Sequence, residues 1–173
     1  MTAVEVYELT SQGGATDFSE VVKVCRALGP YCMIGGLAVN CYVEPIYTMD
    51  ADLVLVAEHL PELPHRLTEA GFKVERFPLS ISAQRGQSQL RIQFITDSRY
   101  QGFPARASLR AILDEPVLVA SVEDVFQGKL WAWSDPSRRL TKREKDRLDL
   151  IRLAEAFPAL RPGLPNGIRE LLP

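Results

Sequence analysis

The sequence predicts an α/β fold, in which a small mixed β-sheet is flanked by helices and followed by a C-terminal helical part. Short apolar or alternating segments, which are typical of strands, occur at 31–34, 50–56 and 90–95. Segments with apolar residues at helical spacing lie before, between and after them. The 173 residues are 46% hydrophobic and 24% charged, an ordinary globular balance that is sufficient for one full core.

Helices are expected where apolar residues recur every three or four positions, at 17–28, 37–43, 60–70, 121–133 and about 141–157. Asp17 is expected to cap the first helix, with Glu20 as its capping partner. Pro45 is expected to end the second, and Ser121 to cap the fourth. Residues 4–9, at the N-terminus, are expected to form either a short strand or a loose arm.

Strands are expected at 31–34, 50–56, 72–77, 90–95 and 116–120. The third strand could continue through residues 79–83, and a turn at 85–88 then predicts a hairpin with the fourth. Alternation in the fourth strand places Gln93 on the face opposite its apolar neighbours. Residues 97–108 are expected to form a polar connection without a strand.

A single domain is expected over residues 1–157, followed by a proline-rich tail over 158–173. The tail contains four prolines and is expected to be extended, with Ile168 and Leu171 able to dock on the domain. No internal repeat and no linker between two domains is visible.

Two carboxylates begin the second strand. Because strand side chains alternate between faces, Asp50 and Asp52 point the same way, with backbones roughly 6.5–7 Å apart. They repel each other unless a cation lies between them, and Mg²⁺ prefers such oxygen ligands and shares them with substrate phosphates. Gly35-Gly36 leads into a helix N-terminus, where free N–H groups favour a phosphate. Together these features predict a metal–triphosphate site; the alternative is a glycine turn followed by solvated acids.

Gly35-Gly36 followed by Asp50-Ala51-Asp52 on a strand resembles the nucleotidyltransferase superfamily, which has the polymerase-β-like fold. Together with Leu37-Ala38, the sequence around the acids, Thr48-Met49-Asp50-Ala51-Asp52-Leu53, is similar to the AbiEii/MenT-type group of small bacterial nucleotidyltransferases. The resemblance covers roughly residues 17–155. Many members of that group are toxins of toxin–antitoxin pairs. The resemblance implies transfer of a nucleoside monophosphate from an NTP to an acceptor. It also implies that Asp50 and Asp52 bind Mg²⁺ and that Gly35 and Gly36 let the backbone approach the triphosphate.

Two further segments match the family. Lys129 begins a Lys-Leu-x-Ala segment, so it is expected to bind nucleotide and to neutralise charge during transfer; the alternative is a lysine whose stem lies along apolar surface. Lys145, Asp146 and Asp149 match a Lys-Asp-x-x-Asp pattern. The resemblance implies a nucleotide-binding role for Lys145 and a catalytic role for Asp149, which adjoins the apolar side of its helix. The alternative is a solvated charged face.

Two departures from the family pattern favour a different possibility. Ile46 and Tyr47 stand where related sequences often carry an arginine, and Gln93 stands where they often carry a third carboxylate. An amide binds Mg²⁺ less well than a carboxylate and cannot act as a general base. The alternatives to an active enzyme are therefore a degenerate nucleotidyltransferase that binds nucleotide or a partner protein without catalysis, and a structural or antitoxin-like partner. If the enzyme is active, Asp149 is the best candidate for the base.

Charge and composition limit the partners. The net charge is −2 and the pI about 5.8, so nucleic acid would have to bind a local basic patch. Such a cluster occurs near the last helix and could hold the phosphates of an RNA acceptor such as a tRNA; it comprises Arg138, Arg139, Lys142, Arg143, Lys145 and Arg147. Three cysteines in apolar surroundings are expected to be buried thiols. With no signal peptide and no membrane span, we expect a soluble cytoplasmic protein whose partners are an NTP, an acceptor and an antitoxin or other protein partner.

Overall fold

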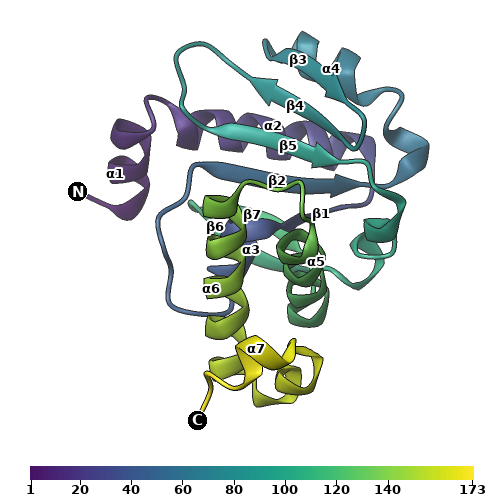
Figure 1. Cartoon of the computed structure of the whole chain (residues 1–173). Coiled ribbons are helices and arrows are strands. Elements are labelled where there is room, and N and C mark those ends of the chain that lie inside the picture. The colour runs from purple at the N-terminus through teal and green to yellow at the C-terminus, as the bar shows by residue number, and fades with distance from the viewer.

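A seven-stranded mixed sheet is the centre of the molecule, as the computed structural model of residues 1–173 shows (Figure 1). The strands are β1 (Tyr31–Ile34), β2 (Asp50–Leu55), β3 (Lys73–Phe77), β4 (Ser80–Gln84), β5 (Arg91–Ile95), β6 (Ser108–Ile112) and β7 (Glu115–Val119). They are ordered β3-β4-β5-β2-β1-β7-β6. The β2–β5 and β1–β7 pairs are parallel, and the other pairs are antiparallel. The predicted α/β fold with a mixed sheet is confirmed.

Helices cover the sheet on both sides. The α-helices are α1 (Ala3–Thr10), α2 (Gly14–Leu28), α3 (Gly35–Val39), α4 (Leu63–Glu69), α5 (Val122–Ser134), α6 (Leu140–Ala156) and α7 (Asn166–Arg169). Short 3₁₀ helices connect them, namely η1 (Ala57–His59), η2 (Ser98–Tyr100), η3 (Pro104–Arg106) and η4 (Pro158–Gly163). In Figure 1, α2 passes behind the sheet, whereas α5 and α6 lie side by side in front of it. None of the helices combines the length and the apolar character that crossing a bilayer requires.

Strand β2 lies in the middle of the sheet, between β5 and β1, and separates core from cleft. Its residues Ala51 and Leu53 are fully buried in the apolar core, while Asp50 and Asp52 are only partly buried on the opposite face. The two-residue period predicted this division. Ser121 caps α5 as predicted, because its hydroxyl accepts a hydrogen bond from the Asp124 N–H at 3.2 Å.

The N-terminus differs from the prediction. Residues 3–10 form helix α1 and not a strand or arm, because Thr2 and Glu5 make a reciprocal capping box. Asp17 is not a cap: α2 begins at Gly14, after Gly13 in a left-handed conformation. Asp17 instead forms an ion pair with Arg85 from the β4–β5 connection, at 2.7 Å.

Three element boundaries also need correction. Helix α3 covers five residues and ends before Asn40, and not at residue 43. Residues 80–84 do not continue β3 but turn back as a separate antiparallel strand, β4, with Phe77 opposite Ser80. Residues 108–112 form edge strand β6, which was not predicted, and the polar connection expected over 97–108 meets it only at Ser108. Four of its five residues are exposed, so it lacks the apolar pattern of a buried strand.

The C-terminal tail is helical, which corrects the extended form predicted for it. Its elements η4 and α7 follow α6 directly, and they lie at the end of the chain below α5 and α6 in Figure 1. Leu164 and Ile168 are buried and belong to the same apolar core as the rest of the chain. Of the two residues expected to dock, Ile168 does so, whereas Leu171 is exposed.

The three cysteines are free thiols. Cys25 and Cys32 are fully buried, as predicted, but Cys41 is only half-buried. Burial raises the pKa of all three thiols above the usual range, so none is disposed to ionise.

Candidate active site

A cleft of about 750 Å³ brings the sequence motifs together. It is lined by residues of β2, β5, α3, α5 and α6, and it contains every site residue that the sequence suggested: Gly35, Gly36, Asp50, Asp52, Gln93, Lys129, Lys145, Asp146 and Asp149. A second hollow, of about 800 Å³, lies beside α1 and α2 and contains none of these residues. The first cleft is therefore the candidate active site.

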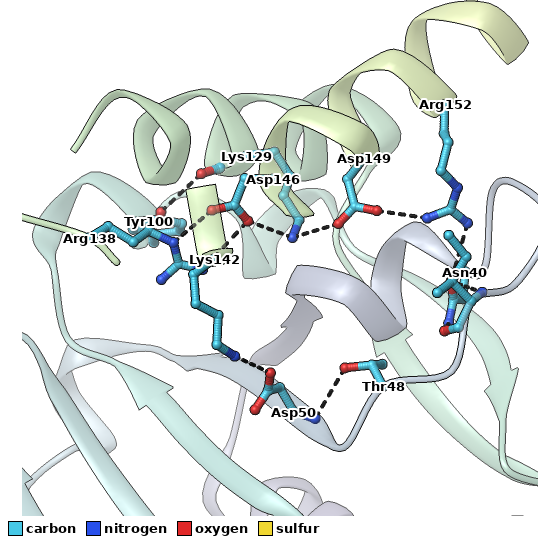
Figure 2. Close-up of polar contacts among 12 residues, drawn as sticks. Asn40, Thr48, Asp50, Tyr100, Lys129, Arg138, Lys142, Asp146, Asp149 and Arg152 are labelled. Atoms are coloured by element: carbon cyan, nitrogen blue, oxygen red, sulfur yellow. Dashed lines mark hydrogen bonds and ion pairs between the residues drawn. The ribbon is translucent and has the colours of Figure 1, made fainter. Parts of the chain in front are cut away.

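Asp50 lies at the start of β2 and is held by two cations. Its Oδ1 accepts a hydrogen bond from Arg91 Nε at 2.6 Å, and its Oδ2 accepts one from Lys142 Nζ on α6 (Figure 2). Burial acts to raise the pKa of Asp50, but the hydrogen bonds from Lys142 and Arg91 outweigh it and hold the pKa below the usual range. Asp50 is therefore an ionised carboxylate.

Asp52, two residues along the same strand, has no such partner: its carboxylate makes no hydrogen bond and no ion pair with another side chain. Burial, reinforced by the negative charge of Asp50, raises the pKa of Asp52 to about 6, against the pull of more distant cations such as Lys129. A carboxylate that is desolvated and uncompensated is a favourable ligand for a metal ion.

The donor set fits Mg²⁺ that is shared with a substrate. No three side chains of the histidine, cysteine, aspartate and glutamate types come together as a metal site. Asp50 and Asp52 alone would hold the ion, which suits Mg²⁺ because this ion keeps several waters and is usually bound by one or two carboxylates plus phosphate oxygens.

Gly35 creates the space in which Asp52 lies. Its φ is +70°, a conformation that side-chain-bearing residues rarely adopt. A Cβ at this position would also collide with Asp52 Oδ2. Gly36 differs, because a Cβ there would make only an ordinary contact with Thr48, at 3.5 Å. Gly35, the first glycine of the motif, therefore has to lack a side chain, because the Asp52 carboxylate occupies the space beside it.

Lys129 is buried between two acids. Its Nζ donates to Asp146 Oδ1 at 2.9 Å and lies 2.8 Å from Asp149 Oδ2 (Figure 2). Only 10% of the side chain is exposed. Burial acts to lower the pKa of Lys129, but the charges of Asp149 and Asp146 outweigh it and raise the pKa, so the ammonium stays charged. The positive charge of Lys129 is shared with these two acids, an arrangement that the sequence motif did not indicate.

The charge cluster extends in both directions from Lys129. Arg138 Nε donates to Asp146 Oδ2 at 2.6 Å, and Arg152 Nη1 donates to Asp149 Oδ1 at 2.7 Å. Arg152 also donates to the backbone carbonyl of Glu44, in the loop between α3 and β2. The cluster of Arg138, Asp146, Lys129, Asp149 and Arg152 thus forms one continuous network along α5 and α6, as Figure 2 shows.

The loop before β2 is tied down through its backbone. Asn40 donates from Nδ2 to the Ile46 carbonyl at 2.7 Å and accepts from the Ile46 N–H at 3.0 Å. The Tyr7 hydroxyl of α1 donates to the Thr48 carbonyl at 2.9 Å. Sequence reasoning missed Arg91, Asn40 and Arg152 as site residues, because contacts between distant segments leave no local pattern.

Gln93 lies beside Asp52. The parallel register between β2 and β5 pairs these two residues, so their side chains share a face of the sheet. Ile92 and Phe94 are buried on the other face, as the predicted alternation requires. The position at which the family often has a third carboxylate is therefore at the site and carries an amide.

The basic cluster near α6 divides in two. Four of its members line the cleft: Arg138, Arg139, Lys142 and Lys145. The other two face away from it, since Arg143 donates to the Trp133 carbonyl at 2.9 Å and Arg147 pairs with Glu144 at 3.0 Å. Lys145 is exposed and takes part in no ion pair, so its charge is available at the cleft.

Comparison with known proteins identifies the family and the fold of the chain. Residues 31–172 match the model of the family described as nucleotidyl transferase AbiEii toxin, type IV TA system. No curated protein sequence matches the chain.

Several solved structures share the fold. One is ANT(2")-Ia in complex with adenylyl-2"-tobramycin, with a TM-score of 0.60 and 19% identity over 91% of this chain and 95% of that chain. An antigenic nucleotidyltransferase-like protein from Paracoccidioides brasiliensis has a TM-score of 0.54 and 16% identity over 92% of this chain and 93% of that chain. JHP933 from Helicobacter pylori has a TM-score of 0.51 and 15% identity, over 92% and 70%. The family model covers most of the chain, and we conclude that this protein belongs to the AbiEii nucleotidyltransferase family.

Proposed function

We propose that this protein transfers a nucleoside monophosphate from a Mg²⁺-bound NTP to an acceptor hydroxyl. The observation that carries the proposal is the Asp52 carboxylate, which faces the cleft beside Asp50 without a counterion of its own. The family to which the chain belongs supports the reaction type.

The metal and the triphosphate would occupy the sheet side of the cleft. Asp50 and Asp52 would hold Mg²⁺, which when bound neutralises triphosphate oxygens and favours departure of the pyrophosphate. Gly35 and Gly36 line the cleft without side chains and leave the backbone open to the phosphates. Lys145, whose ammonium has no acidic partner, contributes a positive charge for the nucleotide.

The helix side of the cleft would supply the acceptor's base. Gln93 cannot take a proton, and Asp146 is almost completely buried, with 1% of its side chain exposed. Asp149 lines the cleft with 12% of its side chain exposed, so it is the carboxylate proposed to receive the acceptor's proton. Lys129, which bonds to both acids, would hold Asp149 in place and add positive charge near the phosphates.

The acceptor we favour is RNA, such as the end of a tRNA. Cations exceed acids among the residues that line the cleft, and Arg139 and Lys145 extend the positive charge to its exposed rim. The toxin description of the family supports a role as the toxin of a pair with an antitoxin partner. NTPs and RNA meet in the cytoplasm, where we place the activity.

A second candidate function follows from Gln93. With two carboxylates in place of three, the site could bind Mg²⁺ and nucleotide but transfer slowly or not at all, as in a degenerate nucleotidyltransferase that binds nucleotide or a partner. We favour a slow enzyme. Replacing Gln93 by aspartate adds a carboxylate next to Asp52, so transfer by Gln93→Asp should be faster than by the wild type.

The test is incubation of the protein with each α-³²P-labelled NTP, total cell RNA and Mg²⁺. Labelled RNA from the wild type, none after addition of EDTA and none from Asp52→Asn are the expected results. Asp52→Asn is a matched control, because it keeps the size of the side chain and removes its charge. Nucleotide binding without any labelled product in the wild type and in Gln93→Asp would establish the binding function instead. Equal labelling by wild type and Asp52→Asn would contradict the site.

A further inference from the structure

Lys142 is the direct side-chain link between the two sides of the cleft. Its Nζ bonds to Asp50 Oδ2, and this is the one hydrogen bond or ion pair between a side chain of α6 and a side chain of the sheet (Figure 2). The two residues are 92 positions apart in the chain. About a quarter of the Lys142 side chain is exposed, and its Nζ has no other partner.

The Lys142 ammonium occupies an oxygen that the proposed metal needs. Mg²⁺ requires direct oxygen ligands at about 2.0–2.1 Å, and a second cation on the same oxygen would repel it. Arg91 contacts the other oxygen of Asp50, so each oxygen already has a cation beside it. A metal that binds Asp50 while both cations stay in place would share an oxygen with one of them, and the repulsion between the two positive charges would weaken its binding.

Of the two cations, Lys142 is the one suited to move into the cleft. It has a flexible four-carbon stem and lies in the first turn of α6, with Arg138, Arg139 and Lys145 as neighbouring lining residues. If Lys142 moved away from Asp50 while the cleft contained no ligand, these neighbouring cations would repel its ammonium. A triphosphate in the cleft changes this, because it supplies a new anionic partner.

Resting on the function proposed above, we propose that Lys142 is an exchangeable counterion that makes metal binding depend on the nucleotide. Lys142 holds the Asp50 carboxylate when the site contains no metal, and it passes to the triphosphate when Mg²⁺ and NTP arrive together. Mg²⁺ alone then binds weakly, because the ammonium that it displaces has no free acid left in the cleft: Asp52 would bind the metal, and Asp146 and Asp149 are paired with other cations. Metal and nucleotide strengthen each other's binding by the same factor.

The test measures two affinities, that for Mn²⁺ alone by electron paramagnetic resonance and that for radiolabelled inorganic triphosphate by equilibrium dialysis with and without Mn²⁺. Triphosphate avoids the question of base preference, and its own binding is followed because it chelates Mn²⁺ in solution. For the wild type, Mn²⁺ should strengthen triphosphate binding about tenfold or more, within the usual range of coupling between two ligands. Lys142→Met should bind Mn²⁺ alone about tenfold more tightly than the wild type and show a smaller coupling between Mn²⁺ and triphosphate. Lys142→Gln should change both quantities in the same direction, and the circular dichroism of each variant verifies that it is folded.

Lys145→Met is the matched control, because it removes the same ammonium from the same helix and cleft but from a residue that pairs with no acid. It should leave the affinity for Mn²⁺ alone close to that of the wild type. If Lys145→Met tightens Mn²⁺ binding as much as Lys142→Met does, only the general field of the cleft matters and the exchange is refuted. Unchanged Mn²⁺ affinity in Lys142→Met would refute it as well.

Asp52→Asn separates this inference from the proposed function. If Asp52→Asn abolishes Mn²⁺ binding while Lys142→Met behaves as the wild type, the metal site stands and the exchange fails. If Asp52→Asn binds Mn²⁺ as the wild type does, or no variant binds it, the metal site is wrong and both proposals fail.

Discussion

The acids on the two sides of the cleft differ in how completely cations compensate them. On the helix side, Asp146 contacts Lys129 and Arg138, and Asp149 contacts Lys129 and Arg152, so each acid has two cations. On the sheet side, Asp50 also has two cations, but Asp52 has none of its own, and the pKa of Asp52 is raised to about 6. Both sides are partly removed from water, yet only on the helix side does every acid have cationic partners.

This difference indicates a structural role for the paired acids of the helix side and a binding role for Asp52 on the sheet side. A buried charge that is paired and hydrogen-bonded contributes to a fixed arrangement, whereas a buried charge without a partner destabilises the fold until a ligand compensates it. The helix side therefore holds its side chains in a fixed arrangement that does not depend on a ligand, and this arrangement positions Asp149 for the proposed proton transfer. The sheet side is where a cation gains most from binding, and four predictions test this division.

The largest effect is expected from breaking the helix side. Asp146→Ala leaves Lys129 and Arg138 without their shared partner, and removal of one member of a buried ion pair costs about 3–5 kcal/mol of unfolding free energy. Glu144→Ala, in the same helix, removes an exposed pair with Arg147 and should cost less than about 1 kcal/mol. Urea denaturation measures both. Similar losses for the two variants would mean that the buried network does not hold the helix side together.

Next in size is the effect of filling the space beside Asp52. Gly35→Ala would force a left-handed alanine, which costs about 1–2 kcal/mol, and the collision with Asp52 adds about 1–3 kcal/mol. Gly36→Ala should cost less than about 1 kcal/mol, because its new methyl group has room. Thermal denaturation without metal compares the two. A difference of only about 1–2 kcal/mol would show that the Asp52 carboxylate moves aside freely, because the cost of the left-handed alanine would remain. Equal losses would contradict both effects.

Removing the uncompensated charge should stabilise the protein. Asp52→Asn without metal is expected to raise the unfolding free energy at pH 7.5 by roughly 1–3 kcal/mol, because the wild type must hold an ionised carboxylate in a desolvated position. Addition of Mn²⁺ should stabilise the wild type and not the variant. A loss of several kcal/mol in Asp52→Asn would instead identify Asp52 as a structural acid.

The smallest expected effect is the change with pH of the difference in unfolding free energy between Asp52→Asn and the wild type. The folded pKa of Asp52, about 6, lies above the unfolded value of about 3.9, so between these values the folded state keeps a proton that the unfolded state has lost. Stability from this group is full below pH 4 and declines as the pH rises to about 6. The advantage of Asp52→Asn over the wild type should thus be near zero at pH 4 and grow by roughly 1–3 kcal/mol by pH 7. A constant advantage in urea titrations across this range would contradict the raised pKa.

Much of this site could be predicted from local sequence. The period of two placed Asp50, Asp52 and Gln93 on the faces where the structure has them, since strand alternation needs no tertiary information. Lys129 and Asp149 were recognised by motif, but their mutual contact was not, because it joins two helices. The bond between Lys142 and Asp50 had no signal at all, as a lysine in a charged run is indistinguishable from a solvated one.

The predicted secondary structure was wrong where tertiary packing outweighed the local sequence pattern. Helix α1 was not predicted because Val4 and Val6 flank Glu5, an alternation that fits a short strand as well as a helix. The helix is stabilised by a capping box and by the buried Tyr7 ring. Edge strand β6 escaped because an exposed edge carries no apolar alternation. The proline-rich tail adopts short helices that pack on the domain, because Leu164 and Ile168 are buried in its apolar core.

The loop from Asn40 to Thr48 is held by bonds to its main chain. Asn40 bonds to the Ile46 N–H and carbonyl, Arg152 to the Glu44 carbonyl and Tyr7 to the Thr48 carbonyl. The side chains of Glu44 and Ile46 take no part in these bonds, and that of Ile46 is exposed at the cleft. Substitutions at these two positions should therefore leave Asp50 in place, so Ile46 is a position where selection could change the acceptor of the proposed transfer while the proposed metal ligands stay fixed.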